Sequence, residues 1–138
     1  MAETLQFELV SPAQLVLSEP VEMAVVPGAE GDFGAMPQHA PLISAVRPGV
    51  IEIHVGGKIA HRIFVAGGFV EVTGERCTVL AEEAIPLAEL TDERLAARAQ
   101  GARKMADEAK DERAVAEAQK ELAVAEAMKA ALEKPAAH

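Results

Sequence analysis

The change in residue usage near Pro86 constrains the fold of this chain more than any other feature of its sequence. Nine of the ten glycines and seven of the eight prolines lie in residues 1–86, whereas residues 87–138 consist mostly of Ala, Glu, Lys and Arg. Glycine and proline mark turns, and alanine is the strongest helix former. The sequence therefore predicts two domains, residues 1–86 and residues 87–138.

Short stretches in which apolar and polar residues alternate fill much of the first domain. This period of two is typical of half-buried strands, and it predicts that every second side chain faces the core. The apolar side chains that alternate in this way are Leu5, Phe7, Leu9, Val21, Met23, Val25, Ile51, Ile53 and Val55. Ile59, Ile63 and Val65 lie in the strand that is predicted to follow.

Turn signals join some of these stretches. Gly56-Gly57 predicts a two-residue hairpin, and Thr73-Gly74-Glu75-Arg76 predicts a second hairpin between Phe69–Val72 and Cys77–Leu80. No helix-length pattern separates the strands, which excludes a parallel α/β sheet. The first domain is therefore predicted to be a β-sandwich or a barrel-like β domain.

The second domain carries a narrow apolar stripe with spacings of three and four residues, the period of an α-helix. Thr91 with Asp92 predicts a helix start and Pro135 a helix stop. Asp111 is a candidate cap for a second helix, but no Gly or Pro marks a break there, so one long helix and two shorter ones both fit. The stripe residues are Leu95, Ala99, Ala102, Met105, Ala109, Val115, Ala118, Leu122, Ala125, Met128 and Leu132.

Two properties of the second domain favour a weakly docked helical hairpin. Its stripe is rich in alanine, which buries little apolar area, and Gly101 lies within the first helical segment. A glycine inside a helix costs about 1 kcal/mol relative to alanine. Such a hairpin is expected to open into a longer helix at modest cost.

Charge and cysteine content exclude several classes of protein. The net charge of −9 argues against binding to nucleic acid or anionic lipid. No apolar run reaches the roughly 20 residues of a membrane span, and the first residues lack the features of a signal or transit peptide. The single cysteine, Cys77, lies in a predicted strand, which favours a buried structural thiol. We expect any membrane contact to be made through a partner.

Residue patterns for catalysis, metal binding and cofactor binding are missing. The four histidines, His39, His54, His61 and His138, have no second ligand at metal-site spacing. Nucleophile-elbow, phosphate-loop and dinucleotide-binding motifs are absent as well. We therefore predict no catalytic residue, no metal and no cofactor.

Residues 27–41 hold three glycines and three prolines within fifteen residues. Two interpretations fit this segment equally well: a corner between two sheets, with turns shaped by Gly and Pro, or a loop that presents Asp32 and His39 to a partner.

The same segment carries a family resemblance. Gly31-Asp32-Phe33-Gly34, followed by Pro37-Gln38-His39-Ala40-Pro41-Leu42, resembles the Glu-Gly-(Asp/Glu)-x-Gly…Pro-(Gly)-His-Ala-Pro-Leu run of the epsilon subunits of F-type ATP synthases. Further blocks follow in the family's order at Arg47–Ile51, Gly67–Val72 and Thr78–Ala84. Together they cover most of residues 5–85.

The resemblance implies a fold, partners and a location. It implies an N-terminal antiparallel β-sandwich followed by a C-terminal α-helical hairpin, in a non-catalytic subunit of the central stalk that links gamma to the c-ring in proton-driven ATP synthesis. It also implies that Asp32 and His39 contact gamma or the c-ring. The helices would restrain ATP hydrolysis by reaching the alpha and beta subunits. The subunit would lie at the cytoplasmic face of the bacterial inner membrane, held there by the complex.

Some family members bind ATP through an (Ile/Leu)-Asp-x-x-Arg-Ala motif at the start of the first helix. Here Thr91 follows Leu90, and Leu95 stands three residues after Asp92, where the motif has arginine. We therefore predict no nucleotide site. One interpretation from another class stays open: a β-sandwich binding module whose tail dimerises as a coiled coil.

Overall fold

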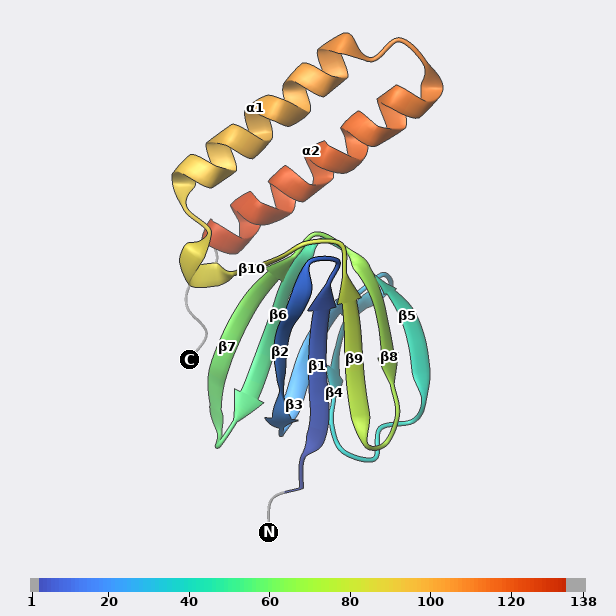
Figure 1. The fold of residues 1–138 in the computed structure, drawn as a ribbon, viewed down its shortest axis with the longest axis vertical. Helices are drawn as coiled ribbons and strands as arrows, with labels where there is room; N and C mark the ends of the chain where they lie inside the picture. The colour runs from blue at the N-terminus through green and yellow to red at the C-terminus, as the bar shows by residue number, and fades with distance from the viewer. Residues whose placement is uncertain (1–2, 134–138) are drawn as a thin grey trace. The chain divides into compact units, whose positions relative to one another are not determined.

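The computed structural model describes residues 3–133, which divide into two compact units. The first ends at Leu87 and holds the strands, and the second begins at Ala88 and holds two helices (Figure 1). The predicted helix stop at Pro135 and the histidine at 138 lie outside the described residues. The helices are α1 (Asp92–Glu108) and α2 (Glu112–Glu133), preceded by a short 3-10 turn, η1 (Leu87–Glu89).

The strands are short and follow one another with tight connections. Their bounds are β1 (Leu5–Ser11), β2 (Gln14–Val21), β3 (Met23–Gly28), β4 (Gly31–Ala35), β5 (Leu42–Val46), β6 (Gly49–Val55), β7 (Lys58–Val65), β8 (Gly68–Val72), β9 (Arg76–Ala81) and β10 (Ala84–Pro86).

Within the described residues, these strands form one continuous sheet in the order β10-β7-β6-β3-β5-β8-β9-β1-β2, and β4 pairs with β3 outside this path. Neighbouring strands are antiparallel except β1 and β9, which run parallel. The sheet folds back on itself, so that β1, β9 and β8 lie in front of β3 and β4 (Figure 1). The predicted fold class, a β-sandwich followed by a helical hairpin, is confirmed.

The apolar alternation of β1 and β6 is reproduced in the core. Leu5, Phe7 and Leu9 are at most 1% exposed, and Ile51 and Ile53 are fully buried. Both strands contribute to one cluster of buried side chains between the layers. Burial of a large apolar side chain contributes roughly 1.5–3 kcal/mol, so these positions dominate the stability of the sandwich.

The prediction for residues 21–25 is wrong after its first residue. Val21 is buried, but the buried side chains of β3 are Ala24, Val26 and Pro27, whereas Met23 and Val25 are half-buried. The chain bends between β2 and β3 at residue 22, so the alternation does not continue from one strand into the next. A shift of one residue moves every later side chain to the other face of the sheet.

Both predicted hairpins are confirmed. The β6–β7 turn consists of Gly56 and Gly57, whose φ angles are 62° and 74°, the left-handed values that a two-residue turn requires. The β8–β9 turn is closed by the Thr73 hydroxyl oxygen, which accepts a hydrogen bond from the Arg76 backbone N–H at 3.1 Å.

Residues 27–41 are more regular than either interpretation of the sequence assumed. They contain the turn of the β3–β4 hairpin and all of β4, and only residues 36–41 form a loop. Gly28 is required at the hairpin because a Cβ there would lie 2.8 Å from the Gly31 carbonyl oxygen. The loop is tied to the β8–β9 turn by a hydrogen bond of 2.7 Å from the Gln38 N–H to the Gly74 carbonyl.

The second unit is two helices, which settles the alternative that the sequence left open. The Thr91 hydroxyl oxygen accepts a hydrogen bond from the Arg94 N–H at 3.1 Å, and an Asp111 carboxylate oxygen accepts one from the Ala114 N–H at 2.8 Å. Each side chain satisfies a backbone donor that the first turn of a helix leaves unpaired. Asp111 therefore starts a new helix without help from Gly or Pro.

The two helices pack against each other along the predicted stripe. Ala102 of α1 and Ala118, Ala125 and Met128 of α2 are buried. Met105 and Val115, also predicted in the stripe, are 38% and 42% exposed. These two positions of the stripe are therefore exposed in the hairpin.

A charged contact also joins the helices. The Arg98 guanidinium of α1 donates from Nε and Nη2 to the two carboxylate oxygens of Glu121 in α2, at 2.7 and 3.3 Å. Bidentate pairs of this kind fix geometry as well as adding energy.

Candidate functional site

The most distinctive surface of the sandwich is a row of apolar side chains on outward-facing positions of five adjacent strands. Leu15, Leu80 and Phe69 are 59%, 56% and 62% exposed, and Ile43 is 74% exposed. We call this surface the apolar band; its members are Leu15 (β2), Val10 (β1), Leu80 (β9), Phe69 (β8), and Ala45 and Ile43 (β5).

Strand register brings these residues together. Val10 pairs with Leu15 on one side and with Leu80 on the other. Leu80 pairs in turn with Phe69, and Phe69 pairs with Ala45. Side chains directly opposite one another on neighbouring strands lie about 4.5–5.5 Å apart, so the band is contiguous.

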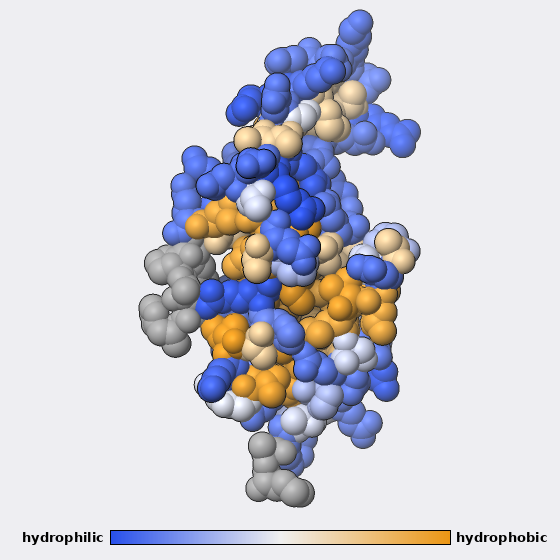
Figure 2. Space-filling view, turned by 60° about the vertical axis from the view of Figure 1, so that its left-hand side comes forward, coloured by the Kyte–Doolittle hydropathy of each residue, from blue (hydrophilic) through white to orange (hydrophobic). Residues whose placement is uncertain are grey.

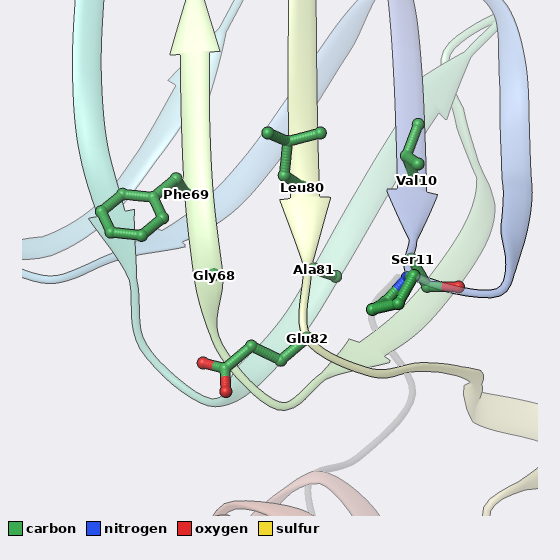
Figure 3. Close-up of a pocket in the computed structure, with 8 residues that line it drawn as sticks. Val10, Ser11, Gly68, Phe69, Leu80, Ala81 and Glu82 are labelled. Atoms are coloured by element: carbon green, nitrogen blue, oxygen red, sulfur yellow. The ribbon is translucent and has the colours of Figure 1, made fainter.

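A shallow groove of about 370 Å³ runs beside the band. In Figure 3, the side chains of Val10, Leu80 and Phe69 project from three neighbouring strands, and Glu82 lies at the end of the groove. The lining is almost wholly apolar, with one carboxylate at the rim. The residues that line it are Val10, Ser11, Pro12, Gly68, Phe69, Leu80, Ala81 and Glu82.

The two units differ in surface character. Figure 2 shows hydrophobic side chains gathered in patches on the sandwich, whereas the helices expose mostly hydrophilic side chains on the same view. Large contiguous apolar patches on a folded protein mark sites of interaction. The sandwich therefore carries the candidate interface.

The apolar band was not among the sites predicted from the sequence. Its signal was present, because apolar residues occupy consecutive positions in Leu9-Val10, Phe69-Val70 and Val79-Leu80. In a two-layer sandwich one residue of each such pair must face outward. Two apolar residues in a row break the alternation of apolar and polar residues. They nevertheless indicate strands that are apolar on both faces.

Asp32 and His39, which the resemblance of the sequence nominated as partner contacts, lie near opposite ends of β5. Asp32, near the start of β4, is ion-paired with Arg47, which directly follows β5. His39 lies in the loop that is tied to the β8–β9 turn, at the other end of β5.

The His39 ring is held by its own loop. Its Nδ1 lies 2.6 Å from the Ala40 carbonyl oxygen, so Nδ1 carries the proton that is donated. The ring is tilted against Phe33, with centroids 6.2 Å apart. These contacts agree with a role in shaping the loop, and the half-buried ring leaves part of its surface available to a partner.

The other two histidines of the sandwich, His54 and His61, lie close to carboxylates of the sandwich itself. His61 Nε2 lies 2.7 Å from a Glu19 carboxylate oxygen, and His54 Nε2 lies 3.8 Å from one of Glu52. Within residues 3–133, no cluster of three His, Cys, Asp or Glu could hold a metal ion. Cys77 is buried as predicted, and this burial raises the pKa of its thiol from 9.0 to about 12.

The helix start resembles the ATP-binding motif only in part. The Thr91 side chain caps α1, and the Arg94 guanidinium donates to the Glu89 carbonyl oxygen at 3.2 Å. Leu95 is half-buried and offers no polar atom. The polar side chains of Thr91 and Arg94 therefore make contacts that stabilise the start of α1.

Comparison with known proteins identifies the family. Residues 4–87 match the family model described as the ATP synthase delta/epsilon chain, β-sandwich domain. The chain is 63% identical over 117 residues to the ATP synthase epsilon chain of Rhodospirillum rubrum, covering 85% of this chain and 87% of that one. The chain belongs to the ATP synthase epsilon family. The epsilon chain of Paramagnetospirillum magneticum is also 63% identical, over 113 residues, which cover 82% of this chain and 85% of that one.

Solved structures of ATP synthases contain chains with the fold of this chain. A chain of the mitochondrial ATP synthase of Euglena gracilis, solved with its c-ring, superposes with a TM-score of 0.79 at 26% identity, covering 94% of this chain and 82% of that chain. A chain from the central stalk and c-ring of the Tetrahymena thermophila enzyme has a TM-score of 0.71 at 12% identity, with 92% and 95% coverage, and shows the shared fold. None of the described helices is long and apolar enough to cross a membrane.

Proposed function

We propose that this epsilon-family chain is a non-catalytic component of the central stalk of its ATP synthase, and that it binds gamma through the apolar band and links gamma to the c-ring. The observation that carries the proposal is the band itself. Four large side chains that are more than half exposed form a contiguous surface on one face of the sandwich. Exposure of apolar surface to water is unfavourable, so burial of this surface by a partner contributes favourable binding free energy.

The band has the anatomy of a protein interface. Its centre holds an aromatic side chain, Phe69, beside Leu80, and the adjacent groove offers a recess for an apolar side chain of the partner. Aromatic anchors near such pockets carry most of the binding energy in many interfaces. The surrounding polar side chains, Ser11 and Glu82 among them, supply a rim.

Binding to the cognate alpha–beta–gamma complex, prepared without this subunit, tests the proposal. We expect wild-type chain to bind at micromolar concentration or below and Phe69→Ser to weaken binding at least tenfold, because interface anchors typically contribute about 2 kcal/mol or more. Ala60→Ser is the matched control, since Ala60 is also an exposed apolar residue on a strand but lies on β7, outside the apolar band.

Three outcomes would argue against this role. Equal binding by Phe69→Ser and wild type would remove the apolar band from the interface. Failure of the wild-type chain to bind would refute the stalk assignment itself. A stable homodimer that does not bind the complex would favour the alternative function, a β-sandwich binding module with a dimerising tail.

We propose further that the helical unit restrains ATP hydrolysis by reaching the alpha and beta subunits. The support is the weak apolar contact between α1 and α2, in which alanines occupy buried positions such as Ala102 and Ala118. Each methylene missing from a buried stripe lowers the packing free energy of the two helices by about 0.8 kcal/mol. The free-energy difference between the closed hairpin and an extended arrangement is therefore small.

A chain that ends after Leu87 tests this second role. We expect this shortened chain to bind the complex as wild type does. We also expect the complex to hydrolyse ATP faster with the shortened chain bound than with the full chain bound. Equal hydrolysis rates with the two chains would exclude inhibition by the helices. As part of the complex, the subunit would be peripheral, at the cytoplasmic face of the inner membrane.

A further inference from the structure

Very little apolar burial holds α1 in place. Of its 17 residues, only Ala102 has a buried side chain, and that side chain is a single methyl group. Leu95, Arg98 and Ala99, which lie seven, four and three positions before it on the same side of the helix, are half-buried. Since most helical stability in proteins comes from tertiary packing, a polar contact on this side of α1 carries unusual weight.

The contact between Arg98 and Glu121 lies on this side and joins α1 to α2. Its two hydrogen bonds, from Nε and Nη2 to the two carboxylate oxygens, measure 2.7 and 3.3 Å, and the side chains are 24% and 32% exposed. By contrast, the pair of Arg113 and Glu117 within α2 measures 3.7 Å, with side chains 91% and 61% exposed. A sheltered pair with two parallel bonds is stronger than an exposed pair with one, so the contact between the helices is the stronger of the two.

The position of this pair along the hairpin also matters. Arg98 and Glu121 are 23 positions apart in the sequence, one on each side of the turn at Asp111, and the two helices run side by side between them (Figure 1). Chain connectivity keeps residues at a turn together even when the helices separate. Arg98 and Glu121 lie several helical turns away from it, so their contact is lost on opening and stabilises only the closed hairpin.

We propose that the Arg98–Glu121 pair is a latch, which holds α1 against α2 and sets how often the helical unit opens. This inference rests on the proposed function, in which an open helical unit restrains ATP hydrolysis, and it names the contact that controls that restraint. The apolar contacts around Ala102 stay in place when the pair is removed. Loss of the latch therefore shifts the balance between closed and open hairpin by a measurable factor and leaves the sandwich unaffected.

Hydrogen exchange of the free full chain measures the latch without any partner. Arg98→Gln and Glu121→Gln each remove the pair, and Gln has nearly the helix propensity of Arg and Glu. We expect each change to speed exchange of amides in the middle of α1 roughly threefold to tenfold, because these amides exchange when α1 separates from α2. The double variant should exchange no faster than the faster single variant, since both changes remove the same contact. Amides of β6 serve as the internal reference and should not change.

Arg103→Gln is the matched control. Arg103 is an exposed arginine of the same helix, so its replacement removes the same charge and leaves the Arg98–Glu121 pair intact. Reversal of the pair supplies a rescue. Arg98→Glu and Glu121→Arg each place like charges together and should speed exchange more than the Gln variants do, whereas the two changes combined should return exchange to within about threefold of wild type.

ATP hydrolysis by the alpha–beta–gamma complex tests the consequence. We expect hydrolysis to be slower with Arg98→Gln bound than with wild type bound, because the open helical unit is more populated. Arg103→Gln should match wild type in this assay as well.

Several results would overturn the latch. Unchanged α1 exchange in both Gln variants would do so, as would an equal effect of Arg103→Gln or a reversed pair that fails to rescue. Wild-type hydrolysis with Arg98→Gln, under conditions in which the chain that ends after Leu87 speeds hydrolysis, would show that the pair does not control the restraint. If neither chain alters hydrolysis, the proposed restraint by the helices fails, and faster exchange of α1 still supports the latch.

Discussion

Gly68, the first residue of β8, is the position at which a single methyl group should do most damage to the sandwich. Its φ is 141°, a value that residues with a side chain rarely adopt. A Cβ at this position would lie 2.0 Å from the Leu80 carbonyl oxygen and 3.0 Å from the Ala81 Cα. These are backbone atoms of β9, so no side-chain rotation can make room.

The magnitude follows from these two terms. A residue held at such a φ costs roughly 1–3 kcal/mol. Forcing extra volume into a packed site typically costs a further 1–3 kcal/mol, and here β8 pairs with both β5 and β9 at Gly68, so it cannot shift without losing a ladder. We expect Gly68→Ala to lower the free energy of unfolding by about 4 kcal/mol. For a domain of this size that is a fall in Tm of roughly 15–30 °C.

Differential scanning calorimetry of the full chain measures this, with Gly57→Ala as the matched control. Gly57 also has a positive φ, 74°, but a Cβ there would meet nothing within 4 Å. Its replacement should therefore cost only the conformational term, about 1–2 kcal/mol. If the two variants lose equal stability, the contact with Leu80 does not matter and the reasoning is refuted.

Three further predictions concern stability. Because burial raises the pKa of Cys77 to about 12, the unfolded chain ionises above pH 9 while the folded chain does not, so wild type should lose about 1.4 kcal/mol more than Cys77→Ala between pH 8 and pH 10 in urea titrations. Gly101→Ala, at an exposed helical position where a Cβ meets nothing, should stabilise α1 by about 1 kcal/mol and slow its hydrogen exchange about fivefold. The fragment 1–87 should unfold cooperatively in calorimetry, since its core cluster comes from the strands alone.

Each of these predictions has a result that contradicts it. Parallel pH profiles for wild type and Cys77→Ala would mean that the thiol ionises equally in the folded and unfolded chain. Unchanged exchange in Gly101→Ala would mean that intrinsic helix propensity does not limit the stability of α1. A fragment 1–87 without a cooperative transition would show that the helical unit completes the core of the sandwich.

The sequence by itself determined the features that depend on neighbours along the chain. Alternation in β1 and β6, the Gly56-Gly57 turn and the cap at Thr91 all rest on contacts within a few residues, so pattern and propensity are sufficient to find them. Asp111 was only a candidate cap in the sequence, because no Gly or Pro marks a break there, and the structure decided for two helices. The family blocks in residues 5–85 identified the epsilon chain because several of them occur in one order, which local physics alone does not dictate.

Tertiary structure decided the features that depend on distant segments. The bend before β3 moved Met23 and Val25 off the core face, because strand phase is set by pairing across the sheet and does not carry through a turn. The apolar band arises only when strands from residues 10 to 80 come into register, and the contact of Arg47 with Asp32 spans 15 positions of the chain. The separation of such residues along the sequence does not determine the distance between them in space, so only the folded structure shows which of them are in contact.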